Sequence, residues 1–384
     1  MRVPAHTWRA RLGTLALFAG SCAVALLLLE VFLRVVDPLG QRLRGDEIVL
    51  PTHVRHVMHN AENRKLDAEI TVSRNGLGFR GPEPPPDFGS WLTLVAVGGS
   101  TTECRFLTDG RDWPAVLAQS LLARFRRTWV DNAGLDGHST YGHAVLLRQR
   151  LARLHPDVAL FLVGVNDVER DDLKSQDRAI TERRAENESF ATRLARVSAI
   201  AAAVQNVGRA ARAEELRLSH LQLDLRAAPT REPEDPARGE RLLRRHRHEY
   251  VRPFRERVLE LVRLCRAAGI TPVLLTQPAL YGPAIDPETG VDLARVEVDA
   301  ARRWDGALAW AVLEAYNDAT RQVAADEGVA LVDLARDLPK SSRLFYDFHH
   351  FTNEGAAAVG RRVAEVLCPE LARRFPAHAQ TACS

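Results

Sequence analysis

The sequence predicts an α/β protein in which a parallel sheet is covered by helices on both faces. Three observations support this prediction: short apolar runs of strand length recur between residues 91 and 334, runs with helical spacing lie between them, and the strand-like runs do not alternate apolar and polar residues. A strand buried on both faces needs no polar face, which is typical of parallel sheets. With 384 residues, 46% hydrophobic and 26% charged, the composition is that of a globular protein and excludes a collagen-like or wholly disordered chain.

The N-terminal segment predicts a membrane-spanning helix. Residues 12–29 carry no charge, and a helix of that length, at ~1.5 Å per residue, covers about 27 Å of the ~30 Å hydrocarbon core of a bilayer. Asp37-Pro38 ends the helix, and the arginines at 2, 9 and 11 favour a cytoplasmic N-terminus. We therefore expect residues 1–37 to be a cytoplasmic stub and single-pass anchor in the inner (cytoplasmic) membrane. The rest of the chain is then periplasmic or otherwise extracytoplasmic.

There are two alternatives to a retained anchor. A cleaved signal peptide would end its apolar region near Ala25, and a lipoprotein would be modified at Cys22. Both require the apolar run to stop at that point, but four leucines follow Ala25 directly. The retained anchor fits the sequence better.

The remaining elements follow in chain order. Residues 38–90 predict a juxtamembrane linker and N-terminal extension without regular structure, because the turn dipeptide Asn75-Gly76 and the proline-rich stretch 82–86 interrupt it. Beyond it, apolar runs predict five strands and the spacing of apolar residues predicts helices between them. The strands are 91–97, 129–132, 158–163, 270–276 and 329–334, and the helices are 113–126, 144–154, 308–325 and 356–367.

Residues from about 168 to 250 interrupt this alternation. They are rich in arginine and glutamate and show helical stretches near 190–227. A solvated helical insertion is the simpler interpretation, and a lid or partner-binding cap over the site is the alternative. Acidic residues are interleaved with the basic ones and the net charge is only +3, so we expect no nucleic-acid partner.

The cysteines do not form an evident framework. There are five, at positions 22, 104, 265, 368 and 383, and no C-x-x-C pair occurs that would indicate a thiol-rich zinc site. Cys368 and Cys383 are able to pair in an oxidising compartment, but free and partly buried thiols are the favoured interpretation.

Residues with useful chemistry gather where the predicted strands end, and sites in open α/β sheets form beyond the carboxyl ends of the strands. Gly98-Gly99-Ser100 follows the first strand and presents a hydroxyl on a tight turn. Gly137 lies in a glycine-rich turn after the second strand and offers a backbone N–H, and Asn166 follows the third strand and offers a side-chain amide. Taken alone, each is more often an ordinary turn or helix cap.

A fourth motif precedes the last predicted helix. Asp347 and His350 are three residues apart across a turn, so the carboxylate is able to fix the tautomer of the imidazole and stabilise its protonated form. The pair His349-His350 is also compatible with a metal site, but no other ligands with suitable spacing lie nearby. We therefore expect no metal.

The order of these four motifs resembles the SGNH/GDSL hydrolase family over about residues 91–367, apart from the insertion. Asn75-Gly76-Leu-Gly78-Phe79-Arg80 also resembles a segment of membrane-anchored bacterial members. The usual Gly-Asp-Ser is here Gly98-Gly99-Ser100, which removes a carboxylate beside the nucleophile but keeps the serine.

This resemblance implies both a fold and a set of roles. The fold is a flavodoxin-like three-layer α/β/α sandwich with a five-stranded sheet of order 2-1-3-4-5, in a hydrolase domain that spans 91–384. Ser100 corresponds to the family nucleophile, and His350 and Asp347 correspond to its acid–base pair. The N–H groups of Ser100 and Gly137 and the amide of Asn166 correspond to its oxyanion hole. The mechanism implied by this resemblance requires no organic cofactor.

The leading functional hypothesis is a serine esterase that hydrolyses O-acyl esters, acetyl esters first among them, on an envelope glycan. The glycan part rests on the expected compartment and on family analogy. An O-acyltransferase would use the same residues. A catalytically inactive glycan-binding or scaffold protein is the third alternative, and it is disfavoured because all five functional positions are filled. Oligomeric state does not follow from the sequence.

Overall fold

The computed structural model describes residues 5–36, 43–44, 47–48, 50–61, 63–170, 194, 198–204 and 223–383. The chain divides into two compact units. One contains Met1–Pro51 and Glu182–Leu218, and the other contains Thr52–Thr181 and Ser219–Ser384. The second unit holds the large sheet and the candidate site.

In the first unit, the main element is α1 (Ala5–Val36). Its stretch Gly13–Val35 has a mean hydropathy of 2.3 and is long and apolar enough to cross a bilayer, a property that membrane anchors and signal sequences share. Glu30 pairs with Arg34 one turn on, at 2.8 Å. The Glu30 carboxylate also accepts hydrogen bonds from the first N–H groups of a helical stretch at 199–204. The other helices predicted within 190–227 fall mostly outside the described residues, apart from 223–227, which form turns.

The second unit is built on a five-stranded parallel sheet with the order β11-β8-β7-β5-β6. Numbered along the chain, this order is 2-1-3-4-5 and confirms the prediction. Every residue of the three strands β5, β6 and β7 is buried, which explains why β5 and β7 are largely apolar without alternation. β6 also buries the polar residues Thr128, Asp131 and Asn132. The strands are β5 (Leu92–Gly98), β6 (Thr128–Asn132), β7 (Val158–Leu162), β8 (Thr271–Leu275) and β11 (Ala330–Val332).

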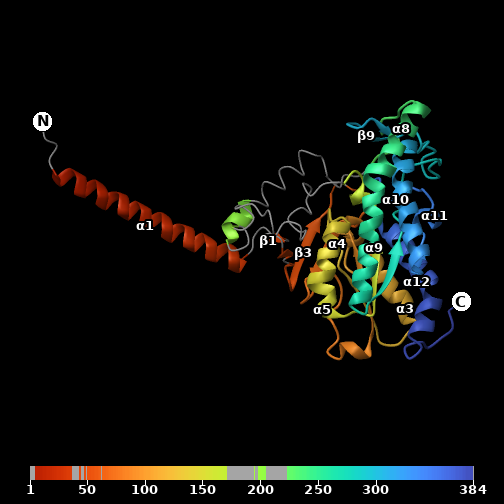
Figure 1. The fold of residues 1–384 in the computed structure, drawn as a ribbon, viewed down its shortest axis with the longest axis horizontal. Helices are drawn as coiled ribbons and strands as arrows, with labels where there is room; N and C mark the ends of the chain where they lie inside the picture. The colour runs from red at the N-terminus through yellow and green to blue at the C-terminus, as the bar shows by residue number, and fades with distance from the viewer. Residues whose placement is uncertain are drawn as a thin grey trace. The chain divides into compact units, whose positions relative to one another are not determined.

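Helices cover both faces of this sheet and confirm the three-layer sandwich (Figure 1). On one face, α12 packs against α3, and the approach is close because a Cβ at Gly360 would lie 2.6 Å from the carbonyl oxygen of Trp113. On the other face, α9 packs between α4 and α10. The helices are α3 (Trp113–Leu122), α4 (Thr140–Leu146), α9 (Arg252–Ala267), α10 (Gly306–Glu327) and α12 (Asn353–Arg374).

Two of these helices continue through a π-helical turn. α4 runs through η2 (Leu147–Leu151) into α5 (Ala152–Leu154). α8 (Pro236–His246) runs through η6 (Arg247–Val251) into α9. Residues 236–250, at the end of the predicted insertion, therefore extend the helix that leads into β8.

Residues 54–74 form an antiparallel hairpin, so the expectation of irregular structure for this segment was wrong. β3 (Val54–His59) pairs with β4 (Glu69–Arg74) in register from Val54 opposite Arg74 to His59 opposite Glu69. β3 buries none of its side chains fully, so its sequence shows little apolar periodicity. The remaining described elements are short: η1 (Phe88–Ser90), α2 (Ser100–Glu103), η3 (Val165–Asp167), β9 (Glu297–Asp299), β10 (Trp304–Asp305), α11 (Leu334–Asp337) and, in the first unit, β1 (Leu43–Arg44) with β2 (Glu47–Ile48).

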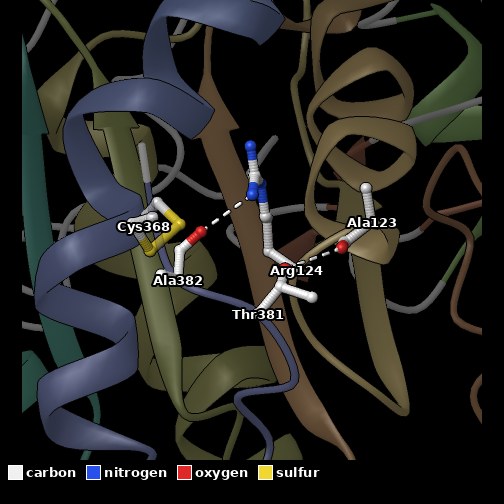
Figure 2. Close-up of a disulfide and its surroundings, with 6 residues drawn as sticks. Ala123, Arg124, Cys368, Thr381 and Ala382 are labelled. Atoms are coloured by element: carbon white, nitrogen blue, oxygen red, sulfur yellow. Dashed lines mark hydrogen bonds between the residues drawn. A yellow bond between two sulfur atoms is a disulfide. The ribbon is translucent and has the colours of Figure 1, made fainter.

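A disulfide joins the C-terminal tail to α12. Cys368 and Cys383 are bonded, although the sequence favoured free thiols (Figure 2). After α12 the tail turns back, and Arg124 donates to the carbonyl oxygen of Ala382 at 2.8 Å while the Thr381 hydroxyl donates to that of Ala123. This return of the tail leaves no periodic signal in the sequence. Closing a loop of 15 residues stabilises a fold by about 3 kcal/mol in the chain-entropy description.

Candidate active site

The carboxyl end of β5 presents Ser100 at the start of the short helix α2. The turn requires glycine, because a Cβ at Gly98 would lie 2.1 Å from the Thr102 hydroxyl oxygen and 2.9 Å from the carbonyl oxygen of Leu162. Ser100 is half-buried, whereas the rest of α2 is fully buried. The first N–H groups of a helix have no acceptor within the helix, and the Ser100 N–H meets none among the described residues.

The loop before α12 brings His350 and Asp347 to this serine. His350 Nε2 lies 2.7 Å from Ser100 Oγ, and His350 Nδ1 lies 2.6 Å from Asp347 Oδ2. The loop is closed by its own backbone, since the Tyr346 N–H donates to the carbonyl oxygen of His350 and the Thr352 N–H to that of Leu344. The structure thus brings together the three residues that the sequence placed 250 positions apart.

The surroundings of Asp347 keep it ionised. Burial by itself would raise its pKa, but the charge and ring N–H of His350, with His349 and its backbone N–H, hold the pKa well below its ordinary value. The backbone N–H groups of His349 and His350 both donate to Asp347 Oδ1, at 2.8 Å and 2.7 Å. A carboxylate facing Nδ1 assigns the proton to that nitrogen and leaves the Nε2 lone pair facing the Ser100 hydroxyl. The Tyr346 ring stacks on the imidazole of His350, with centroids 5.6 Å apart.

Hydrogen-bond donors also lie in the turns that follow the two strands flanking β5. Asn166 follows β7 and donates one amide hydrogen to the carbonyl oxygen of His138 at 3.0 Å, so its second amide hydrogen is not used by that bond. Gly137, in the turn after β6, has a φ of +73° that favours glycine, and its N–H has no acceptor among the described residues. The amide of Asn166 also lies against Gly99, where a Cβ would be 2.1 Å from Asn166 Nδ2.

A buried charge network fixes the base of this side of the site. The Asp167 carboxylate accepts from the backbone N–H of Thr140 at 3.2 Å and from its hydroxyl at 2.5 Å, and so holds the start of α4. Arg257 of α9 donates to the Thr140 hydroxyl at 2.7 Å and pairs with Asp167 at 3.3 Å. Asp167 therefore acts in positioning the turn that carries Asn166.

Two residues beyond β8 contact the acid–base loop and α2. The hydroxyl of Tyr281 lies 3.0 Å from His349 Nε2, and Gln277 Oε1 accepts from the Thr101 hydroxyl at 3.3 Å. Burial raises the pKa of Tyr281, so its hydroxyl keeps the proton in this contact. In the sequence, only their position just after a predicted strand indicates that these two residues lie near the site.

No group of three or more His, Cys, Asp or Glu side chains is arranged to hold a metal ion within the part of the chain that the structure describes. The geometry around Ser100 is instead that of a hydroxyl, an imidazole and a carboxylate in series, which is suited to nucleophilic catalysis.

Comparison with protein families also indicates a hydrolase. Residues 96–358, more than half of the chain, match the GDSL-like lipase/acylhydrolase family. The chain belongs to this family. In this GDSL-like hydrolase, the matched segment begins within β5 and ends in the second turn of α12.

Solved structures similar to this GDSL-like hydrolase are distant in sequence. An alpha/beta hydrolase from the metagenome of Lake Arreo, Spain, is 20% identical over 71% of this chain and 93% of its own, with a TM-score of 0.40. A putative lipolytic protein of the G-D-S-L family from Desulfitobacterium hafniense is 14% identical over 72% and 99%, with a TM-score of 0.39. The lipase/acylhydrolase from Enterococcus faecalis is 15% identical over 72% and 96%, with a TM-score of 0.40. No curated protein sequence matches significantly.

Three buried charged residues support the site and were not identified from the sequence. Arg74 and Arg80, from β4 and the segment after it, contact Glu103, the last residue of α2, through its carboxylate and its backbone carbonyl. All three are at most 8% exposed. The only signal was the resemblance of residues 75–80 to membrane-anchored members, which pointed to the segment without giving its role.

Proposed function

We propose that the protein is a serine esterase that hydrolyses O-acyl esters through an acyl-enzyme formed on Ser100. The observation that carries the proposal is the unbroken hydrogen-bonded series from Asp347 through His350 to Ser100, with separations of 2.6 Å and 2.7 Å. Membership of a lipase/acylhydrolase family supports the same class of reaction.

The reaction follows from this series. His350 Nε2 takes the proton of the Ser100 hydroxyl as its oxygen attacks the ester carbonyl carbon. The resulting imidazolium is stabilised by Asp347 and gives its proton to the departing alcohol as the acyl-enzyme forms. Water then enters, loses a proton to His350 and attacks the acyl carbon, which releases the carboxylic acid and restores the Ser100 hydroxyl.

Negative charge on the carbonyl oxygen needs donors at the site. In this proposal they are the N–H groups of Ser100 and Gly137 and the remaining amide hydrogen of Asn166. The absence of acceptors for the first two N–H groups among the described residues supports this role, because both are left to meet substrate. One such donor is worth about 10²–10³ in kcat where it has been measured.

The catalytic domain is proposed to be extracytoplasmic. The disulfide between Cys368 and Cys383 supports an oxidising compartment, and α1 supports attachment to the inner membrane. The substrate that this compartment brings within reach is an O-acetylated envelope glycan. An alkaline phosphatase fused after residue 384, which folds only outside the cytoplasm, is active if the orientation is right and inactive if it is wrong.

The test of the esterase is cleavage of nitrophenyl acetate by the full chain in detergent. Ser100→Ala is expected to lower kcat by at least about 10⁴-fold. Ser120→Ala, which removes a hydroxyl bonded to its own helix in α3, serves as the matched control. A fluorophosphonate is expected to label Ser100, as mapped by peptide mass. Unchanged cleavage by Ser100→Ala would overturn the nucleophile, and acetylated sugar in preference to free acetate, after addition of a sugar acceptor, would favour an O-acyltransferase.

A further inference from the structure

Glu103 connects the N-terminal hairpin to the turn that carries Gly137. Its side chain is 1% exposed. One carboxylate oxygen accepts from Arg74 Nη2 at 2.6 Å, and the other accepts from the backbone N–H of Asp136 at 2.7 Å. Arg74 is itself buried, and its second terminal nitrogen donates to the carbonyl oxygen of Gly78.

The position of Glu103 makes this bridge relevant to the reaction. Glu103 is three residues from Ser100 on the same short helix, and Asp136 directly precedes Gly137. The turn also lies against the backbone of α2, since a Cβ at Gly134 would be 2.2 Å from the Glu103 nitrogen. The hydrogen bond from the Asp136 N–H to the Glu103 carboxylate therefore fixes the distance between Ser100 and the Gly137 N–H.

A buried carboxylate is retained in a fold only when its charge is compensated. Arg74 of β4 compensates the charge of Glu103. β4 lies before residues 96–358, so it is outside the segment that matches the family. The hairpin is thus joined to the site by an ion pair between side chains that are 7% and 1% exposed.

We propose that Arg74 and Glu103 are positioning residues that hold the Asp136–Gly137 peptide at the distance from Ser100 that the reacting carbonyl oxygen requires. The proposal rests on the proposed function, since it assumes that the Gly137 N–H receives the developing oxyanion. Its consequence is that the N-terminal hairpin is a working part of the active site.

Glu103→Gln in the full chain tests the proposal. An amide cannot accept from both Arg74 and Asp136 while its NH₂ group faces one of these donors, so one contact is lost and the turn shifts. We expect kcat for nitrophenyl acetate to fall about 10-fold to 100-fold with KM within twofold, since small displacements of catalytic groups have costs of this size. Affinity for a trifluoromethyl ketone, which mimics the tetrahedral state, is expected to fall by the same factor.

The control is Glu297→Gln, the same substitution in the Arg231–Glu297 ion pair of β9, whose side chains are 24% and 19% exposed. It is expected to leave both readouts unchanged. If Glu103→Gln does not fold, the pair Arg74→Lys and Arg74→Met replaces it, with the lysine variant expected to retain most of the kcat that the methionine variant loses. A folded Glu103→Gln with wild-type kcat and ketone affinity, or equal kcat in the two Arg74 variants, overturns the positioning role. If Ser100→Ala also remains active, the proposed function itself fails.

Discussion

The two halves of the site are held in different ways. The half that carries His350 and Asp347 is a single loop, in which Phe345 is bridged to Phe351 and Asp347 Oδ1 accepts from the backbone N–H groups of the second and third residues after it. Lys65, between β3 and β4, and the Leu280 N–H donate to carbonyl oxygens of this loop from outside it. The half that carries Ser100 is assembled from turns after β5, β6 and β7 and is held by side chains from the N-terminal hairpin. The pairing that defines the first half, Asp347 with His350, is local in sequence, whereas the pairing of Glu103 with Arg74 in the second half joins distant segments.

This difference extends to the buried charges. In the local loop, His350 and nearby N–H groups hold the pKa of Asp347 below its ordinary value, so the fold favours the carboxylate. In the Ser100 half, burial raises the pKa of Asp131 to about 7, and burial also raises the pKa of Asp112 beside Arg80. The local half therefore gains stability from ionised aspartate, whereas the assembled half loses stability when its aspartates ionise.

The largest expected effect of a single change lies in the local loop. Asp347→Asn keeps an oxygen that accepts from the backbone N–H groups of His349 and His350, so the loop is expected to keep its shape. The amide no longer fixes the His350 tautomer or stabilises its protonated form, and kcat is expected to fall about 10⁴-fold. Steady-state hydrolysis of nitrophenyl acetate measures this. A loss under tenfold in a folded variant would show that the carboxylate does not serve the imidazole.

A smaller effect is expected in the assembled half from Gly99→Ala. The added methyl group would lie 2.1 Å from Asn166 Nδ2, and the end of that side chain is free to swing aside. The expected result is a fall in kcat of about 10²–10³, the cost of losing one donor to the oxyanion. Thermal unfolding is expected to change little.

Gly134→Ala is the contrasting control for Gly99→Ala, because its methyl group would lie 2.2 Å from the backbone nitrogen of Glu103 and no side chain is able to move away. That variant is expected to lose stability as well as activity. If Gly99→Ala keeps wild-type kcat, Asn166 is not needed where the structure places its amide.

The features that could be predicted from the sequence are those that depend on residues close together in the chain or on runs of apolar residues. Asp347 and His350 are recognisable because their interaction spans three residues, and the parallel sheet is recognisable because buried strands must be apolar on both faces. The sheet order followed from family resemblance, and the structure confirms it.

The buried ion pair between Arg74 and Glu103 could not be predicted from the sequence. The two positions are 29 apart and produce no periodic pattern, and charged residues are expected to be exposed to solvent. The hairpin β3–β4 and the disulfide between Cys368 and Cys383 were missed for a related reason. β3 has no buried face to produce an alternating pattern, and the tail pairs with α12 only because the chain reverses after Arg374. β4 does alternate and buries Ile70 and Val72, but this short pattern was not recognised as a strand, whereas the return of the tail leaves no pattern at all.

The last expected effect concerns the pH dependence of stability in the two halves. Because the folded pKa of Asp131 is about 7, against an ordinary value of 3.8, the native state holds a proton that the unfolded chain has lost between these pH values. The contribution of Asp131 is therefore complete below about pH 4 and declines by about 1.4 kcal/mol per pH unit until about pH 7. Asp131→Asn removes this decline, since the amide carries no charge and its oxygen still accepts from Asn75, which donates to Asp131 at 2.8 Å.

Urea unfolding of the full chain in detergent from pH 4 to pH 8 measures the slope. The variant is expected to match the wild type near pH 4 and to exceed it above pH 6, with Asp112 accounting for any decline that remains. Asp347→Asn is expected to leave the slope over this range unchanged, because a lowered pKa stabilises the fold throughout it and that gain is lost only below about pH 4. Parallel stability curves for wild type and Asp131→Asn would mean that Asp131 is ionised in the folded protein. The two halves would then not differ in how they hold charge.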